Sequence, residues 1–317
     1  MDLGVTYISA HQPQHIAPDM QHLQEIGCSE VLFALQENHI DVLTGALRFG
    51  ARIALDHGLR PYVVVWGFAN TFGGGRMSLR MLDDRSLWRV ERDGTPMPKA
   101  CLNNPRLVDR FADITELCCR HGYQGMFVDE PTIQECFCPI CRDTFRAAYG
   151  ADLVASYGSP AYRAFQSATV SHYTRAVSAR VKAIDARLRT MTCIMPIDQD
   201  SFEAVAAIPE LDVFGTDPYW LLPGAAMTIE QAVACAEQAR DAGRRHGKVS
   251  QVWLNCWGIP AGSEAAIYTG GRALAAIGCD SMYTWSFRGG LGTNEECTNA
   301  ALAWDSVVRL YQELSGK

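Results

Sequence analysis

Residues 104–131 read NPRLVDRFADITELCCRHGYQGMFVDEP, and this stretch carries the pattern that decides the fold. Apolar residues recur every three or four positions, at 107, 108, 111, 114 and 117, which predicts an amphipathic helix. Asn104 is a good N-cap, Pro105 suits the first helical turn, and Gly122 suits the end. The apolar run 125–128 follows directly and is typical of a parallel strand covered on both faces.

The same strand–helix unit recurs along all 317 residues. Strand-like cores occur at 4–9, 30–35, 60–66, 125–128, 189–195, 213–216, 249–254 and 281–286, and further helical patterns at 159–186 and 228–243. Eight units without a linker predict an α/β chain folded as a single (β/α)8 TIM barrel over residues 1–317. The alternative is a doubly wound open sheet. It is less favoured, because no dinucleotide-type glycine fingerprint follows the first strand.

Composition narrows the functional classes. The net charge is −7 and no basic tract is present, which argues against nucleic acid and anionic membranes as partners. No apolar run approaches the ~18 residues that span a bilayer, and the first residues lack a signal-peptide layout, so we expect a cytoplasmic protein. Twelve cysteines in such a chain indicate metal binding or buried thiols rather than disulfides.

Four cysteines have the arrangement of a metal site. Cys136, Cys138 and Cys141 form C-x-C-x-x-C, and Cys101 lies 35 residues before the first of them. In a barrel, the loops after the third and fourth strands are neighbours at the same end. Four thiolates from these loops predict a closed, structural Zn²⁺ site. His121 is an alternative fourth ligand, although it should lie at the opposite end of the barrel.

The segment around these cysteines resembles the family 42 β-galactosidases and related clan A glycoside hydrolases. The resemblance rests on Cys-x-Asn-x-Pro at 101–105, a glutamate ending the fourth strand, and Glu-Cys-Phe-Cys-x-x-Cys-Arg-x-x-Phe at 135–145, all within residues 100–150. It implies zinc on Cys101, Cys136, Cys138 and Cys141, and Glu130 as general acid/base. It also implies a cis peptide bond after a tryptophan that ends the eighth strand, here Trp285-Ser286.

Two positions depart from that clan. Asp129 stands where the clan has asparagine before its acid/base glutamate, and no glutamate ends the seventh strand, where the chain reads Trp-Leu-Asn255-Cys-Trp. The resemblance therefore implies a glycosidase-type barrel with a zinc-braced loop, and it does not imply β-galactosidase activity.

Glycoside hydrolysis needs two carboxyl groups, one protonated and one ionised. Asp129, Glu130 and Asp217 all stand at predicted strand ends, where barrel enzymes carry their chemistry. Our first assignment is Glu130 as general acid/base and Asp217 as the second carboxylate across the mouth, with Asp129 raising the pKa of the acid by repulsion. Alternatively, Asp129 is the nucleophile and Asp217 the acid/base, as in another clan, or Asp217 only caps the following turn. Loop residues Glu37, Glu264 and Glu295 are reserve candidates.

Further strand-end side chains suit a sugar, because aromatic rings stack on its C–H faces and polar groups bind its hydroxyls. The substrate-binding candidates are His11, Gln36, Asn38, His39, Trp66, Asn70, Tyr219, Trp220, Asn255, Trp257, Trp285 and Arg288. Arg288 binds an acidic sugar in this view, or else pairs with Asp217 or Glu130.

The sequence thus predicts a glycoside hydrolase acting on a small glycoside or oligosaccharide, with no nucleic acid or membrane partner and with a homo-oligomer allowed. Two alternatives stay open. One is a sugar isomerase, epimerase or lyase that uses strand-end carboxylates and a divalent metal. The other is a carbohydrate-binding barrel without catalysis.

Overall fold

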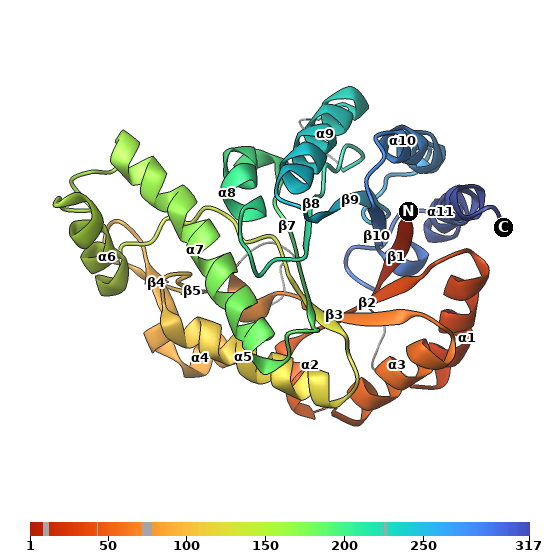
Figure 1. Ribbon diagram of the computed structural model, residues 1–317, viewed down its shortest axis with the longest axis horizontal. Helices are drawn as coiled ribbons and strands as arrows, with labels where there is room; N and C mark the ends of the chain where they lie inside the picture. Colours follow the sequence, from red (N-terminus) through yellow and green to blue (C-terminus); the bar gives the residue numbers. More distant parts are fainter. Residues whose placement is uncertain (9–12, 43, 72–77, 223, 225–226) are drawn as a thin grey trace.

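The structure is a computed structural model that describes residues 1–317 except 9–12, 43, 72–77, 223 and 225–226. Eight parallel strands close into a barrel, which confirms the predicted TIM-barrel fold class (Figure 1). Around the ring the order is β1 (Asp2–Tyr7), β10 (Ser281–Trp285), β9 (Val249–Asn255), β8 (Val213–Thr216), β7 (Arg189–Cys193), β6 (Gly125–Val128), β3 (Arg60–Val65) and β2 (Glu30–Leu35). The predicted strand ends lie within two residues of these bounds.

Helices surround the barrel (Figure 1). They are α1 (Pro13–Glu25), α2 (Glu37–Val42), α3 (Thr44–Asp56), α5 (Pro105–Arg120), α7 (Pro160–Ile184), α8 (Phe202–Ala206), α9 (Ile229–Arg245), α10 (Glu264–Ala276) and α11 (Ala300–Ser315). The expected caps are present: the Asn104 side chain accepts from the Arg106 amide, and Thr228 and Gln231 form a capping box. No helix in the described part of the chain is long and apolar enough to cross a bilayer.

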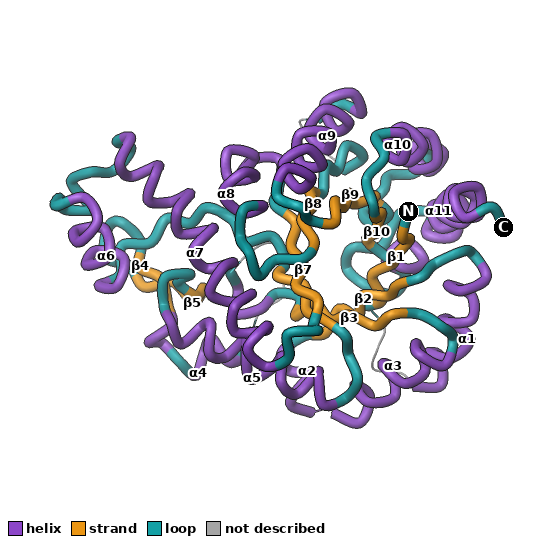
Figure 2. Tube along the Cα trace, in the orientation of Figure 1, coloured by secondary structure: helices purple, strands orange, loops and turns teal. Residues whose placement is uncertain are grey.

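The long connection between β3 and α5 contains structure that the sequence pattern does not predict. It holds η1 (Phe68–Asn70), α4 (Arg80–Asp83), η2 (Arg85–Leu87) and an antiparallel hairpin of β4 (Trp88–Val90) and β5 (Pro96–Ala100). The strands are short and half-exposed, so they lack a buried apolar run. The Asp93-Gly94 pair at the turn is typical of a β-hairpin and is a sequence signal for this one. Figure 2 shows the hairpin and α6 (Pro139–Tyr149) together at one side of the barrel.

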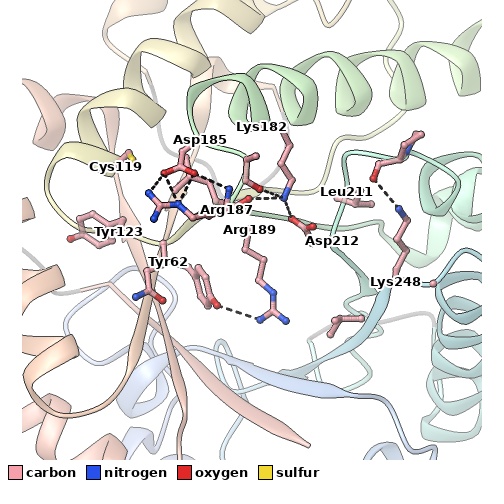
Figure 3. Close-up of a pocket in the computed structure, with 16 residues that line it drawn as sticks. Tyr62, Cys119, Tyr123, Lys182, Asp185, Arg187, Arg189, Leu211, Asp212 and Lys248 are labelled. Carbon is pink, nitrogen blue, oxygen red and sulfur yellow. Dashed lines mark hydrogen bonds and ion pairs between the residues drawn. The ribbon is translucent and has the colours of Figure 1, made fainter.

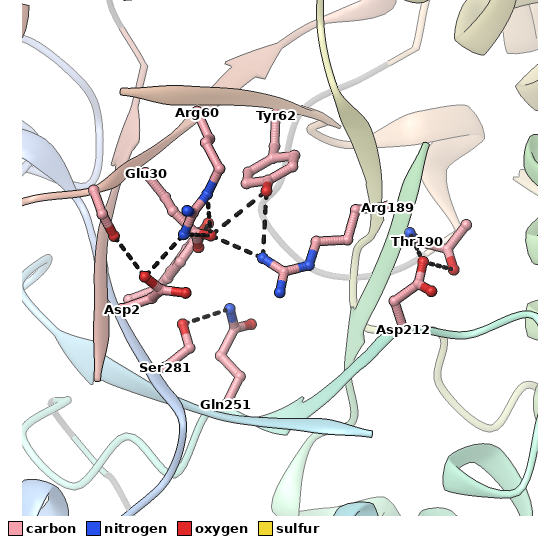
Figure 4. A network of polar contacts seen from close by, with 11 residues as sticks. Asp2, Glu30, Arg60, Tyr62, Arg189, Thr190, Asp212, Gln251 and Ser281 are labelled. Atoms are coloured by element: carbon pink, nitrogen blue, oxygen red, sulfur yellow. Dashed lines mark hydrogen bonds and ion pairs between the residues drawn. The ribbon is translucent and has the colours of Figure 1, made fainter. Parts of the chain in front are cut away.

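A buried ion-pair network closes the barrel at the N-terminal ends of its strands (Figure 4). The Glu30 side chain is 1% exposed and lies 2.6 Å from Arg60 Nη2 and 2.8 Å from Arg189 Nη1. Tyr283 donates its hydroxyl to Glu30 Oε2 at 2.6 Å. One carboxylate therefore joins the first residues of strands β2, β3 and β7 to the middle of β10, and its charge is fully compensated.

We predict that Glu30→Gln destabilises the fold by about 2 kcal/mol, because it leaves two arginines without their shared carboxylate. Solvent partly screens the charges of these arginines, which limits the loss. Asp185→Asn is the matched control, since Asp185 pairs with a 90% exposed Arg187 at the same end of the barrel. Urea unfolding gives both free energies. If Glu30→Gln lowers the free energy of unfolding no more than Asp185→Asn does, the buried network contributes no more to stability than an exposed ion pair.

Candidate active site

A cavity of about 240 Å³ opens at the C-terminal ends of the barrel strands. Four acidic and six aromatic side chains line it, together with Cys193, Met195 and Leu222. The acids are Asp129, Glu130, Asp217 and Glu295, and the aromatic residues are Trp66, Phe127, Tyr219, Trp253, Trp257 and Trp285. The three acids singled out from the sequence thus lie on one cavity, with a fourth that was only a reserve candidate.

Asp129 and Glu130 follow β6 directly, and both line the cavity although they are consecutive. Glu130 has φ of 37°, a left-handed conformation that is unusual for a residue other than glycine. The strand alternation is broken there, so both carboxylates project to the same side. One oxygen of each and the Cys193 Sγ, at the end of β7, all lie within 4.8 Å of one another.

Asp217 follows β8, and its carboxyl group lies close enough to that of Glu130 for each to shift the pKa of the other. We expected these two acids to face each other across the width of a sugar. In the ring, β6 and β8 are separated only by β7, and both acids line the same cavity.

Burial raises the pKa of Glu130, and the contact with Asp217 lowers it in part. Burial raises the pKa of Asp217 well above its usual range, and repulsion from the Glu130 charge adds to that effect. Burial also raises the pKa of Asp129 well above its usual range, with additional repulsion from Glu130 and Glu295. Like charges this close to one another disfavour full ionisation, so these acids keep protons to a higher pH than exposed carboxyl groups do.

Glu295 comes from the loop between η4 (Phe287–Gly290) and α11, beyond the end of β10. Trp285 Nε1 donates a hydrogen bond to Glu295 Oε2 at 3.2 Å. In the ring of eight strands, β10 lies four places from β6 and is therefore directly opposite it. Glu295 therefore lines the cavity from the side of β9 and β10, where its carbonyl also accepts from the Gly258 amide.

Packed aromatic rings form much of the cavity wall. Trp285 makes an edge contact with Trp66 at 5.5 Å between ring centroids, and Tyr219 makes one with Trp257 at 6.0 Å. The Trp285-Ser286 peptide bond is cis, as the family resemblance implied. The indole nitrogens of Trp253 and Trp257 and the Asp217 Oδ1 are buried without a hydrogen-bond partner among the described residues. Buried polar atoms of this kind are costly unless a ligand satisfies them.

Other substrate-binding candidates lie away from the cavity lining. Arg288 pairs with Asp19 at 3.1 Å, so it contacts neither Asp217 nor Glu130. Asn70 donates to the Pro98 carbonyl and accepts from the Ser78 amide, which ties η1 to the hairpin. Trp220 packs against Gly270 of α10, and Asn255 is fully buried with its amide donating to the Trp257 carbonyl.

The remaining candidates follow β2. Gln36, Asn38 and His39 lie at the start of α2, away from the residues that line the cavity, and Glu37 beside them pairs with Arg110. His11 lies outside the described residues. The cavity residues that we did not predict are Phe127, Cys193, Met195, Leu222 and Trp253. Phe127 and Trp253 lie inside apolar strands, where nothing in the sequence separates them from the core.

The four predicted cysteines meet in one cluster, and their Sγ atoms lie within 4.8 Å of one another. Cys101 follows β5, and its Sγ is 3.4 Å from that of Cys141 in α6 and 3.6 Å from that of Cys138. All four side chains are buried, and the Asn103 amide donates to the Cys141 Sγ at 3.3 Å. The cluster can hold a metal ion. His121 caps the end of α5 and is not a member.

A larger hollow of about 940 Å³ lies at the opposite end of the barrel (Figure 3). Four of its charged residues form two ion pairs: Lys182 lies 2.6 Å from Asp212, and Arg187 lies 2.7 Å from Asp185. Arg189 pairs with Glu30, and Lys248 donates to the Ile208 carbonyl at 2.6 Å. Because these charges have partners and barrel enzymes act at the other end, this hollow is not the candidate active site.

Comparison with known proteins gives the fold its context. Neither a family model nor a curated protein matches the sequence. Among solved structures, a β-galactosidase from the Antarctic haloarchaeon Halorubrum lacusprofundi superposes with a TM-score of 0.71 at 17% identity, over 99% of this chain and 58% of that one. A family 42 β-galactosidase from G. stearothermophilus gives 0.70 at 13% identity, over 99% and 56%. The catalytic domain of a β-amylase from Paenibacillus polymyxa gives 0.65 at 9% identity, over 98% of both chains.

The chain thus spans just under three fifths of the length of the β-galactosidases. At these identities the similarity establishes the fold and leaves activity open. The chain has the TIM-barrel fold found in glycoside hydrolases.

Proposed function

We propose that this protein is a glycoside hydrolase that cleaves a small glycoside or oligosaccharide in the cavity at the barrel mouth. The observation that carries the proposal is a group of acids with raised pKa, Glu130 and Asp217 among them, that lines one cavity walled by aromatic rings. A carboxyl group with a raised pKa is the acid that glycosidic bond cleavage requires. The glycoside hydrolase fold supports the same reading.

Glu130 delivers the proton in this proposal. Its side chain is partly exposed and lines the cavity, whereas Asp217 is 5% exposed. Proton transfer needs direct contact with the glycosidic oxygen, which favours the more accessible group. Asp217 then acts on Glu130 through the repulsion between their charges, which opposes loss of the last proton from the pair.

The cavity wall suits a sugar. The rings of Trp66, Tyr219, Trp257 and Trp285 offer stacking surfaces for its C–H faces. The indole N–H groups of Trp253 and Trp257, which lack partners among the described residues, can donate to its hydroxyls. A volume of about 240 Å³ is below the ~300–1,000 Å³ of pockets for drug-sized ligands, so one sugar ring fills it.

Zinc is the metal that fits the cysteine cluster. Four buried thiolates from two loops offer a closed tetrahedral site, which binds Zn²⁺ for structure and leaves no position for water. Cys101 belongs to the hairpin segment, and the other three to the segment after β6 that begins with Asp129 and Glu130. Bound zinc would therefore brace the rim beside the acids. All twelve cysteines are free of disulfide bonds. Reduced cysteines are typical of cytoplasmic proteins, which agrees with the proposed location.

A metal-dependent sugar isomerase, epimerase or lyase is the second candidate, because Asp129, Glu130 and Cys193 lie close enough to hold an ion. Glycoside hydrolysis is favoured, because six aromatic rings and acids with raised pKa line one cavity. Activity that survives a chelator supports the hydrolase. Activity that is lost to a chelator and restored by Mg²⁺ or Mn²⁺ supports the second candidate.

We predict that Glu130→Gln lowers turnover of aryl glycosides at least about 100-fold, because glutamine cannot donate the proton. A panel of aryl α- and β-glycosides, with released phenol as the readout, checks this. Glu135→Gln is the matched control, since Glu135 is exposed on the same loop and bonds Tyr157. Equal turnover in the two variants would remove Glu130 from the mechanism.

Asp217→Asn should move the basic limb of the kcat/KM–pH profile to lower pH, by about one pH unit or more. In the wild type, repulsion between the two carboxylates raises the pH at which the pair loses its last proton. With asparagine no like charge opposes ionisation of Glu130, so the active protonated form is lost at lower pH. Asp200→Asn, an exposed carboxylate on η3 (Pro196–Ser201), should leave the limb in place. A basic limb that stays or rises in Asp217→Asn contradicts the pairing.

Metal analysis of the purified protein should give one zinc per chain. Cys141→Ser should lose the zinc and lower the melting temperature, because metal binding stabilises the folded state. Cys119→Ser, a partly buried cysteine outside the cluster, should keep both. A Cys141→Ser protein with full zinc and unchanged melting temperature would show that the cluster is not the site.

A further inference from the structure

We propose that Glu295, on the loop between η4 and α11, is the nucleophile that attacks the anomeric carbon from the wall opposite Glu130. This inference rests on the proposed hydrolase function and supplies what that function still needs, a carboxylate on the far side of the scissile bond. The end of β9 offers no acid, because Asn255 stands there and is fully buried.

The other two acids are too close to Glu130 for this task. Asp217 lies beside Glu130, close enough to shift its pKa, and Asp129 has an oxygen within 4.8 Å of one of Glu130 and belongs to the same chain segment. The two carboxyl groups of a retaining glycosidase stand about 5–5.5 Å apart on opposite faces of the sugar. Groups that touch each other, or that leave one strand side by side, cannot bracket a bond.

Glu295 meets the positional requirement. It lines the same cavity, and it follows β10, which lies opposite β6 in the ring. Its charge contributes to raising the pKa of Asp129, so the two carboxyl groups face a common space. The Trp285 indole donates to Oε2, which orients the carboxylate and stabilises its negative charge.

The loop holds Glu295 in place before any ligand arrives. The Glu295 carbonyl accepts from the Gly258 amide at 2.9 Å, just beyond β9, and its amide donates to Thr293 Oγ1 at 3.1 Å. Thr293 in turn donates to the Gly290 carbonyl at 2.7 Å. Gly290 has φ of 70°, and a Cβ there would stand 2.9 Å from the Glu295 carbonyl oxygen. A catalytic group fixed by such contacts needs little reorganisation during the reaction.

The reaction balances with these two residues and water. A Glu295 carboxylate oxygen bonds to the anomeric carbon as the bond to the leaving oxygen breaks, and the Glu130 proton passes to that oxygen, which departs as an alcohol. Water then attacks the anomeric carbon and gives one proton to the Glu130 carboxylate. The ester bond breaks, which frees the sugar and restores the Glu295 carboxylate. The narrow cavity favours this retaining course, since an inverting one needs space for water beside the ring.

The test uses the aryl glycoside that the wild type cleaves fastest. Glu295→Gln should lower turnover at least about 1,000-fold while the melting temperature stays near the wild-type value, because glutamine still accepts the Trp285 hydrogen bond. Glu296→Gln is the matched control, since Glu296 is the exposed neighbour and bonds the Gly292 amide. It should keep wild-type turnover.

Azide distinguishes a nucleophile from a residue that only orients Trp285. Sodium azide should restore turnover to Glu295→Ala and yield a glycosyl azide of the opposite anomeric configuration, whereas wild-type hydrolysis retains the configuration by NMR. Wild-type turnover in Glu295→Gln while Glu130→Gln is inactive overturns this inference alone. So does an inverted wild-type product, or failure of azide to rescue a folded Glu295→Ala. A wild type that cleaves no glycoside in the panel overturns the proposed function and this inference with it.

Discussion

The closeness of the Glu130 and Asp217 carboxyl groups is the constraint on which the rest of the account depends. Each shifts the pKa of the other, and both follow strands that are separated only by β7 at the barrel mouth. Asp129 and Glu295 add two more acids to the same cavity. Negative charge is costly in an apolar space, so acids in this cavity keep their protons to a higher pH than acids on a polar surface do.

The two ends of the barrel treat buried acids in opposite ways. At the N-terminal end, Glu30 is surrounded by Arg60, Arg189 and two tyrosines, so its charge is neutralised and serves stability. At the C-terminal end, no arginine or lysine is among the described residues that line the cavity. Arg288, the one arginine among the predicted substrate-binding residues, is paired with Asp19 instead. Four acids thus lie together where barrel enzymes carry out their chemistry, and the strained backbone of Glu130, with φ of 37°, is found at the same end.

The sequence predicted the fold because parallel strands covered on both faces appear as short apolar runs, and because helix caps such as Asn104 and Thr228 are local signals. It also predicted that the four cysteines meet, since neighbouring loops of a barrel fix their proximity. The acids that directly follow strands, Asp129, Glu130 and Asp217, were found by the same geometric rule. In each case a short stretch of sequence contained the necessary information.

What the sequence could not predict depends on contacts between distant segments. Glu295 reaches the cavity only because the loop is held by η4 and the Gly258 amide, and no local pattern distinguishes it from Glu264 or Glu296. The separation of Glu130 and Asp217 likewise depends on how far two strand ends lean together. Side chains that follow β2 and side chains in η1 looked equally suitable in sequence, yet Glu37 and Asn70 serve internal contacts.

Carbon-13 NMR titration of the side-chain carboxyl groups tests the central claim most directly, with Glu130→Gln and Asp217→Asn used to assign the two signals. Ordinary aspartate and glutamate side chains ionise near pH 3.9 and 4.3. The account predicts that the Glu130–Asp217 pair loses its first proton well before its second, and that the second is lost only well above the ordinary carboxyl range. Complete ionisation of both groups below about pH 5 would contradict it.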